Sequence, residues 1–329
     1  MQRDVAGSDH KPSSPLISVI IPAYNTAPFI GETLLSVVRQ TFTDFEIIVV
    51  NDGSPDTPAL EEALAPFAAR IRYIVQENRG LSGARNAGMA VARGEFVAFL
   101  DSDDAWEADY LECQLAELRS RGLAVVYANA TTFGDPLRSG RLFMDMHPSS
   151  GDVTIASLVA QRCNVMVSVL ARRDAVVKAG LFDESLRSSE DFDLWLRVIS
   201  SGGTIGYHRK PLVRSRLHRG SLSANGVSMC QHIVRVLDKT AKEMKLTPAE
   251  RELIARRRGD FAALQRLHEG RRAFFAGAFT EATEALTEAN KVLRRRKLAI
   301  ALPLLRLMPG VLLRAYDLRD RLVFRTLTR

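Results

Sequence analysis

The sequence predicts an α/β fold with a mostly parallel central sheet, followed by a C-terminal α-helical region. Between residues 16 and 100, four short apolar runs typical of buried strands alternate with segments of helical periodicity. Such alternation indicates βαβ units, whose parallel strands are joined by right-handed crossovers. From about residue 225 the pattern is helical throughout. We therefore expect a disordered lead-in over residues 1–15, an α/β domain over 16–224 and a helical region over 225–329.

The first half of the expected domain contains the clearest strands. The run 96–100 is apolar at every position, which is typical of a strand buried on both faces of a parallel sheet. In chain order we expect strands at 16–21, 45–50, 71–75 and 95–100. The segments between them carry apolar residues at helical spacing or many small residues, and we expect these segments to be helices.

The second half of the domain is less regular. Residues 134–151 are rich in Gly, Pro, Ser and Met and predict a long loop, which we interpret as a functional lid. Before it we expect a helix over 106–121, ended by Gly122, and a strand over 123–133. After it we expect a strand at 165–171, helices at 173–179 and from about 188 to 201, and an extended segment at 205–217.

The formal net charge of +7 over 329 residues is unevenly distributed. Residues 251–329 contain 18 Lys and Arg against 8 Asp and Glu, whereas residues 1–250 contain 27 against 30. A slightly acidic body argues against nucleic acid as a partner, while a basic tail fits an anionic membrane surface or a solvated helix. The three cysteines lack metal or disulfide spacing, and the N-terminus lacks an apolar signal region, so we expect a cytoplasmic protein.

Three carboxylates, Asp101, Asp103 and Asp104, follow the strand expected at 95–100. The carboxyl ends of parallel strands form the edge at which open α/β sheets bind ligands. A hard divalent cation held there by one or two carboxylates keeps coordination positions open for substrate phosphates. The alternative is an acidic loop that caps a helix beginning near Trp106, where the helix dipole favours negative charge.

Five segments in series resemble the family 2 glycosyltransferases of the GT-A fold, and the resemblance covers about residues 16–223. Each segment stands at the carboxyl end of an expected strand or at a helix start. The segments are Ile17-Ser18-Val19-Ile20-Ile21-Pro22-Ala23-Tyr24-Asn25, Asn51-Asp52-Gly53-Ser54, Asn78-Arg79-Gly80 through Ala84-Arg85-Asn86, Asp101-Ser102-Asp103-Asp104 and Ser189-Glu190-Asp191. The resemblance implies an inverting enzyme that moves a sugar from a nucleotide diphosphate to an acceptor.

The resemblance implies a nucleotide-sugar site at these strand ends. The implied donor-binding residues are Pro22, Ala23, Tyr24, Asn25, Asp52, Asn78, Gly80, Arg85, Asp101 and Ser102. The first three would line a slot for the base, Asp52 would accept a hydrogen bond from the base imide, and Asp101 would lie on the ribose side. Arg85 would approach the base or a phosphate. From the residues alone, a turn role for Asp52 and a solvent-facing position for Arg85 remain open.

The same resemblance implies a divalent cation, Mn²⁺ or Mg²⁺, that Asp103 binds and that bridges the diphosphate oxygens. Such a cation acts as a Lewis acid for the leaving diphosphate. His218, in the segment 216–223, would complete the metal shell or close over the diphosphate. A solvated loop histidine is the alternative from the residues alone. We place Trp195 on the acceptor side, together with the lid, and Asp104 either behind the metal ligands or on the acceptor side.

Glycosyl transfer to a hydroxyl also needs a base, which removes the proton as the new C–O bond forms. The resemblance implies Asp191 as this base, with Glu190 beside it, and a base opposite the diphosphate implies single displacement with inversion. From the residues alone, a capping box of Ser188 and Asp191 remains open. The helix dipole would lower the pKa of Asp191, whereas burial beside Phe192 and Trp195 would raise it.

The chain departs from the processive members of the family, since it contains neither a Gln-x-x-Arg-Trp motif nor a membrane span. We therefore expect a non-processive enzyme that adds one sugar at a time, with a UDP-sugar donor by analogy and a saccharide or lipid-linked acceptor in surface-polysaccharide assembly. The alternative function is a catalytically inactive nucleotide-sugar-binding or scaffold protein. A sugar nucleotidyltransferase would need a Gly-rich loop after the first strand, and residues 22–26 contain no glycine.

The tail contains an apolar stretch, 298–313, that is interrupted by Pro303, Arg306 and Pro309. It is shorter than the roughly 20 apolar residues that span a bilayer. Because basic residues flank it, we expect a helix that lies in a membrane interface, with the enzyme peripheral at the inner face of the membrane. The alternative is a helix packed on the catalytic body or on a second copy of the chain in a homo-oligomer.

Overall fold

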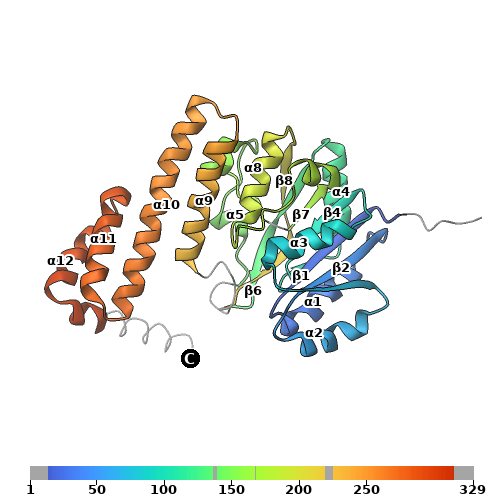
Figure 1. Ribbon diagram of the computed structural model, residues 1–329, viewed down its shortest axis with the longest axis horizontal. Helices are drawn as coiled ribbons and strands as arrows, with labels where there is room; N and C mark the ends of the chain where they lie inside the picture. Colours follow the sequence, from blue (N-terminus) through green and yellow to red (C-terminus); the bar gives the residue numbers. More distant parts are fainter. Residues whose placement is uncertain (1–13, 136–138, 167, 219–224, 315–329) are drawn as a thin grey trace, which may run out of the picture. The chain divides into compact units, whose positions relative to one another are not determined.

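A computed structural model describes residues 14–135, 139–166, 168–218 and 225–314, and Figure 1 shows the course of the chain. The chain divides into two compact units, residues 1–218 and 219–329. The first unit is an α/β domain, and the described part of the second unit is α-helical. Residues 1–13 of the expected lead-in lie outside the described residues.

Within the described residues, the first unit is built on an eight-stranded mixed sheet with the order β3-β2-β1-β4-β7-β6-β8-β5. The strands are β1 (Ile17–Ala23), β2 (Phe45–Asp52), β3 (Ile71–Gln76), β4 (Phe96–Phe99), β5 (Ala105–Trp106), β6 (Val125–Phe133), β7 (Val169–Arg172) and β8 (Ile205–Arg216). β3, β2, β1 and β4 are parallel neighbours, so their carboxyl ends meet at one edge. β7 pairs antiparallel with both β4 and β6.

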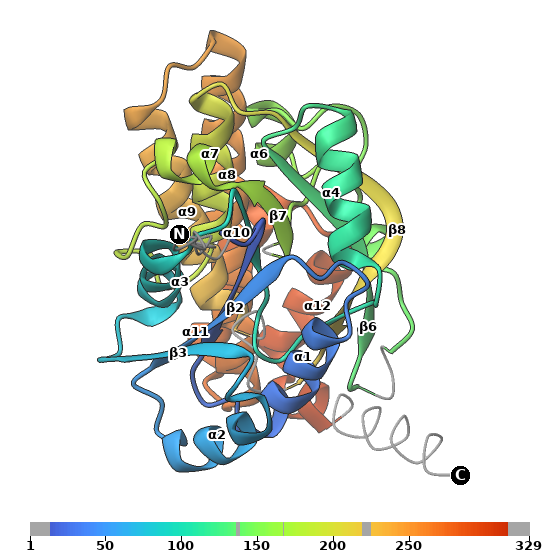
Figure 2. The same ribbon diagram turned by 90° about the vertical axis from the view of Figure 1, so that its right-hand side faces the viewer.

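Helices cover both faces of the parallel part of the sheet. The helices of this unit are α1 (Ala27–Val38), α2 (Thr57–Leu64), α3 (Gly80–Val91), α4 (Tyr110–Ser120), α5 (Phe143–Met146), α6 (Ile155–Val159), α7 (Arg173–Lys178) and α8 (Glu190–Ser200). Apolar side chains of α1, α2 and α4 share one core with Ile17, Val19 and Ile21 of β1. α3 lies on the opposite face, where Gly88 touches Ile20, and Figure 2 shows α3 on one side of β2 and β3 with α1 and α2 on the other. The expected layered α/β architecture is therefore confirmed.

The helix expected over 106–121 is shorter in the structure. α4 begins at Tyr110, whereas Trp106 belongs to β5, which pairs antiparallel with the Val213 and Arg214 region of β8. The indole is 3% exposed and stacks on the Tyr110 ring, with 4.0 Å between ring centroids. Positions 106 and 110 also satisfy helical spacing, so periodicity alone could not separate the two arrangements. The prediction that the acidic loop leads straight into a helix is wrong.

The segment expected as a long loop, 134–151, is largely irregular where it is described, with only the short helix α5 inside it. Its far end is tied to the sheet, because the hydroxyl groups of Tyr127 and Ser149 lie 2.7 Å apart in a buried hydrogen bond. The strand expected at 165–171 begins later, at Val169. The role of this segment as a lid stays a prediction.

The second unit contains α9 (Gly226–Glu243), α10 (Pro248–Phe275), α11 (Phe279–Leu293) and α12 (Arg296–Leu307). α10 begins with a capping box, in which Thr247 and Glu250 exchange side-chain and backbone hydrogen bonds. α10, α11 and α12 share a small core formed by Leu267, Phe274, Ala282, Leu286, Ala289, Leu302 and Leu305. Of the helices that the structure describes, none combines the length and apolar character needed to cross a bilayer.

Candidate active site

The edge formed by the carboxyl ends of β1, β2 and β4 collects most of the expected site residues. The end of β1 supplies Pro22 and Ala23, both buried, and the loop after it supplies Tyr24, which is 51% exposed. Asn25 follows in a left-handed conformation (φ 55°), so the chain turns sharply there into α1. The role of Pro22, Ala23 and Tyr24 as a slot for a nucleotide base stays a prediction.

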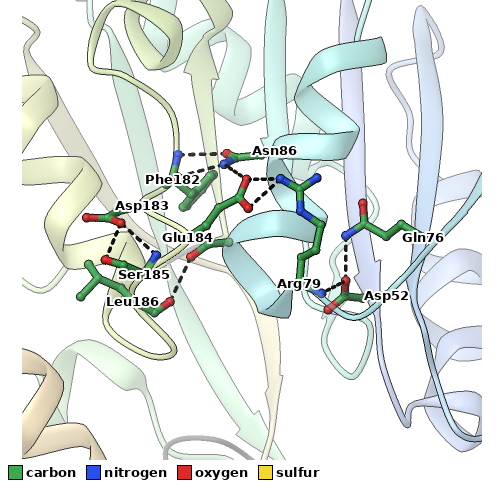
Figure 3. A network of polar contacts seen from close by, with 10 residues as sticks. Asp52, Gln76, Arg79, Asn86, Phe182, Asp183, Glu184, Ser185 and Leu186 are labelled. Atoms are coloured by element: carbon green, nitrogen blue, oxygen red, sulfur yellow. Dashed lines mark hydrogen bonds and ion pairs between the residues drawn. The ribbon is translucent and has the colours of Figure 1, made fainter.

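Asp52 lies at the end of β2 and is only 3% exposed. Its Oδ1 accepts two hydrogen bonds, from Nε2 of Gln76 at 2.7 Å and from the backbone N–H of Arg79 at 2.9 Å (Figure 3). The carboxylate therefore supports the loop between β3 and α3. Both bonds end on one oxygen, and Oδ2 has no hydrogen-bond partner among the described residues. This second oxygen is the one that could accept a bond from a ligand.

The first turns of α3 are joined to the segment before α8, as Figure 3 shows. Arg79 donates from Nη2 to both carboxylate oxygens of Glu184, at 2.8 and 2.7 Å. Asn86 accepts a bond from the backbone N–H of Phe182 and donates from Nδ2 to Glu184 and to the Phe182 carbonyl oxygen. These bonds connect residues about a hundred positions apart and hold the approach to α8 against the first turns of α3. Asn78, also expected to bind the donor, is exposed, and Gly80 opens α3.

Arg85 lies on the inner face of α3 and is 1% exposed. Its Nη2 donates to Oδ1 of Asp101 at 2.7 Å, and its Nη1 donates to Oε1 of Glu190 at 2.5 Å. Burial disfavours the charged guanidinium, but Asp101 and Glu190 more than compensate, and the pKa of Arg85 is raised above its ordinary value. The solvent-facing alternative for Arg85 is therefore wrong. The guanidinium joins the acidic loop after β4 to the first turn of α8.

The acidic loop is held by both backbone and side-chain bonds. Ser102 is buried and donates to Oγ1 of Thr26 at 2.9 Å, which ties the loop to the start of α1. Asp104 is 8% exposed, and its Oδ1 accepts a bond from the backbone N–H of Arg216 at 2.8 Å. Burial, together with the charges of Asp103 and Asp101, raises the pKa of Asp104 well above its ordinary value. Asp104 thus stabilises the acidic loop through its bond to the backbone of Arg216.

Asp103 and His218 form the pair expected to meet a metal. Oδ2 of Asp103 lies 2.9 Å from Nε2 of His218, and the imidazole also packs against the Phe29 ring at 4.9 Å between centroids. Burial and the neighbouring charge of Asp101 raise the pKa of Asp103, while the bond to His218 opposes this shift. The structure therefore brings together two groups that stand 115 residues apart in the sequence.

The side chains at this edge that could bind a metal suit a cation that binds together with a phosphate group. Across the described ranges, no group of three or more His, Cys, Asp or Glu side chains is arranged to hold a metal ion. Asp103 and His218 offer one carboxylate and one imidazole, so further ligands would have to come from diphosphate oxygens and water. Mg²⁺ is commonly bound in this way. The set does not resemble a closed metal centre with ligands from the protein alone.

Asp191 stands in the first turn of α8, and no side chain caps this helix start. Ser189, the residue before the helix, has a left-handed conformation (φ 59°), and Oδ1 of Asp191 accepts a bond from the N–H of Phe192 at 2.7 Å. The capping box with Ser188 is therefore wrong. Burial raises the pKa of Asp191 to about 7, and the charge of Glu190 adds to this shift while Arg85 opposes it. A carboxylate with such a pKa suits general base catalysis near neutral pH.

The expected acceptor-side role of Trp195 needs correction. Its side chain is 0% exposed, and its indole Nε1 has no hydrogen-bond partner among the described residues. An indole enclosed by protein on all sides supports the α8 core and cannot itself touch an acceptor.

Arg216 was not expected at the site, yet its Nε donates to the Asp103 carbonyl oxygen at 2.8 Å and its guanidinium pairs with Glu32. Its position two residues before His218 was the only available sequence signal.

Comparison with known proteins defines the class to which this fold and edge belong. The family model described as "Glycosyl transferase family 2" matches residues 18–164. The putative teichuronic acid biosynthesis glycosyltransferase TuaG of Bacillus subtilis is 30% identical over 216 residues, which are 64% of this chain and 82% of TuaG. The chain therefore belongs to glycosyltransferase family 2.

Another relative is also a glycosyltransferase, and solved glycosyltransferase structures have a similar fold. An uncharacterized glycosyltransferase of Rickettsia conorii is 32% identical over 205 residues, which are 62% of this chain but only 33% of that relative, so the chain matches about a third of its length. The crystal structure of S. aureus TarS 1–349 with UDP-GlcNAc has a TM-score of 0.60 at 19% identity and covers 88% of this chain and 86% of that chain. The mannosyltransferase PcManGT of Pyrobaculum calidifontis, in complex with GDP-Man and Mn²⁺, has a TM-score of 0.58 at 19% identity over 89% and 79%. These likenesses confirm the expected GT-A fold.

Proposed function

We propose that this glycosyltransferase moves one sugar at a time from a nucleotide diphosphate, with UDP as the expected nucleotide, to a saccharide or lipid-linked acceptor in cell-surface polysaccharide assembly. The named role of TuaG in teichuronic acid biosynthesis supports the last part. The single observation that carries the proposal is that buried Arg85 bonds to both Asp101 and Glu190. These two bonds join the edge at which we propose that the nucleotide binds to the start of α8, where the carboxylate of Asp191 has a raised pKa.

The donor is proposed to lie along the carboxyl edge of β1, β2 and β4. Oδ2 of Asp52 is the acceptor that we assign to the base, and the exposed Tyr24 ring is the surface that we assign to its face. TarS was solved with UDP and UDP-GlcNAc, whereas PcManGT was solved with GDP-Man, so this fold accepts either base. UDP remains our expectation by analogy.

A divalent cation, Mn²⁺ or Mg²⁺, held by Asp103 and His218 would supply Lewis-acid stabilisation to the leaving diphosphate. The PcManGT complex with Mn²⁺ supports this assignment. Arg216 keeps Asp103 in place by donating to its carbonyl oxygen. The single positive charge of buried Arg85 offsets one of the two negative charges of Asp101 and Glu190, which reduces the repulsion of a diphosphate at this edge.

Asp191 is the base in this proposal. Its carboxylate accepts the proton of the acceptor hydroxyl while the hydroxyl oxygen bonds to the anomeric carbon and the bond from that carbon to the diphosphate oxygen breaks. One displacement from the face opposite the diphosphate inverts the anomeric centre. Glu190 cannot replace Asp191, because it is buried and committed to Arg85.

The test is to incubate the purified chain with UDP-sugars, Mn²⁺ and a saccharide or lipid-linked acceptor, and to determine the anomeric configuration of the transferred sugar by NMR. The expected product has the configuration opposite to that of the donor. Retention would contradict single displacement. Binding of UDP-sugars without transfer or hydrolysis, for any acceptor class offered, would favour the inactive binding protein instead.

A further inference from the structure

α12 has apolar side chains on two faces. Leu302 and Leu305 point into the core of the second unit and are 8% and 3% exposed. Ile300, Leu304 and Leu307, spaced four and three residues apart, share the opposite face and are 70%, 47% and 79% exposed. A helix that only packed on its neighbours would have polar residues on this second face.

The exposed face continues beyond α12. Met308 and Val311 are 51% and 56% exposed, and we call the five residues Ile300, Leu304, Leu307, Met308 and Val311 the apolar ridge. Twelve large apolar side chains are exposed in the part of the chain that the structure describes, and five of them belong to this ridge. Single exposed apolar residues are ordinary on protein surfaces, but a contiguous set indicates an interaction surface.

The surroundings of the apolar ridge are strongly cationic. Residues 289–316 contain no Asp or Glu. They contain seven basic residues, all exposed: Lys291, Arg294, Arg295, Arg296, Lys297, Arg306 and Arg314. Within the described ranges, none of the seven forms an ion pair with a carboxylate. The charge therefore has no internal partner in this part of the structure.

We infer that the apolar ridge is a docking surface for an anionic lipid membrane. Apolar side chains flanked by cations match the two attractions of such a surface, since acyl chains receive the apolar groups and anionic headgroups attract the cations. α12 has 12 residues, far fewer than a bilayer-spanning helix needs, so it would lie in the interface plane.

Two other occupants fit the observations less well. A second copy of the chain, paired through the same surface in a two-fold dimer, would bring two stretches of seven uncompensated cations together. A nucleic acid would satisfy the cations but would leave five exposed apolar side chains without a partner. Of these three occupants, an anionic lipid surface is the one that satisfies both the charge and the apolar side chains.

The test is co-sedimentation of the full chain with phosphatidylcholine vesicles, with and without phosphatidylglycerol. We expect binding to the anionic vesicles and much weaker binding to the neutral ones. The double variant Leu304→Asp/Leu307→Asp should bind at least about 10-fold more weakly, because two exposed side chains lose their apolar contact with lipid. The triple variant Arg294→Gln/Arg295→Gln/Arg296→Gln should bind roughly 100-fold more weakly, at about fivefold for each cation.

Matched control variants distinguish a role of the apolar ridge in vesicle binding from general effects of adding or removing surface charge. Val177→Asp introduces a charge at an apolar residue of α7 that is 53% exposed, and Lys245→Gln/Arg256→Gln removes exposed cations outside residues 289–316. Both controls should bind the vesicles as the unmodified chain does, and circular dichroism should show that every variant is folded.

Several results would overturn the inference. These are equal binding to neutral and anionic vesicles, no vesicle binding at all, and unchanged binding by the two ridge variants. Dimers in solution that the Leu304→Asp/Leu307→Asp variant disperses would assign the ridge to a second copy. None of these readouts depends on sugar transfer, so the inference and the proposed function can fail separately.

Discussion

Arg85 forms a buried ion pair with Glu190, the residue that directly precedes Asp191. Nη1 and Oε1 lie 2.5 Å apart, and the two side chains are 1% and 6% exposed. The other terminal nitrogen of the same guanidinium holds Asp101 at 2.7 Å. One side chain therefore sets the position of the acidic loop relative to the first turn of α8, and this relationship leads to the first prediction.

Removing Arg85 alone should destabilise the protein strongly. Arg85→Ala leaves Glu190 buried without its partner, and breaking a buried pair from one side typically costs about 3–5 kcal/mol. Arg85→Met/Glu190→Leu removes both charges and should lose clearly less, because no unpaired charge stays buried. The free energy of unfolding in urea measures both variants. Equal losses would show that packing around Arg85, rather than the pair, determines the cost.

Asp191→Asn should leave donor binding intact while it lowers kcat. The amide cannot take a proton from the acceptor hydroxyl, and loss of a general base typically lowers the rate by about 10²–10⁴-fold. Initial rates with saturating donor and a UDP titration give the two quantities. Asp174→Asn, at an exposed carboxylate in the first turn of α7, is the control and should behave as the unmodified protein. A loss of UDP affinity in Asp191→Asn would instead assign a structural role to Asp191.

The pH dependence should follow the raised pKa of Asp191. The base is active when ionised, so kcat/KM, which reports the ligand-free enzyme, should rise as the pH increases through about 7. The contribution of Asp191 to the free energy of unfolding changes in the opposite direction. Because the pKa of Asp191 is higher in the folded than in the unfolded protein, the folded state binds the proton more tightly. The stabilisation is therefore lost as the pH rises from about 4 to about 7. The Asp191→Asn variant should lack this decline in urea unfolding measured across the same window. A kcat/KM that is flat across pH 7 would contradict the assignment of the base.

Asp103 and His218 should make nucleotide binding depend on the metal. In the unmodified chain, UDP with Mn²⁺ should raise the midpoint of thermal unfolding, and a chelator should remove most of the shift, because a ligand that binds only the folded state stabilises it. Asp103→Asn and His218→Gln should each weaken Mn²⁺-dependent UDP binding by at least about 10-fold, since each removes one of two protein donors. An unchanged midpoint shift in both variants would remove this metal assignment.

Two helical glycines should respond oppositely to substitution by alanine. A Cβ at Gly88 of α3 would lie 2.4 Å from Cγ2 of Ile20, a fully buried strand residue, so Gly88→Ala should destabilise the protein by about 1–3 kcal/mol. A Cβ at Gly31 of α1 would meet no atom within 4 Å, so Gly31→Ala should stabilise it by about 0.5–1 kcal/mol. Urea unfolding of both variants is the measurement. Stabilisation by Gly88→Ala would contradict the close contact of α3 with β1.

Sequence patterns were sufficient for much of the first unit and for the position of its ligand edge. Apolar runs followed by polar turns predicted β1, β2 and β4 closely, because strands buried on both faces leave an unambiguous local signal. Trp106 was assigned to the wrong element, since its spacing from Tyr110 suits a helix, whereas its partner strand lies more than a hundred residues further along the chain. Pairing between distant strands leaves no mark in a local window.

The roles of the side chains at this edge were likewise predictable from the sequence only in part. The chain order of its residues was enough to bring Asp52, Asp101 and Asp103 to one edge, because the strands before them are parallel neighbours. It could not reveal that Trp195 is enclosed or that Arg216 supports the acidic loop.

The sequence by itself thus determined the family, the positions of the parallel strands along the chain and the residues that follow them, since these depend on local apolar patterns and short motifs. Only the tertiary structure decided that Arg85 is buried between Asp101 and Glu190 and that the pKa of Asp191 is raised. Both results depend on which charges and how much water surround a group, and residues far apart in the chain supply those surroundings only after folding.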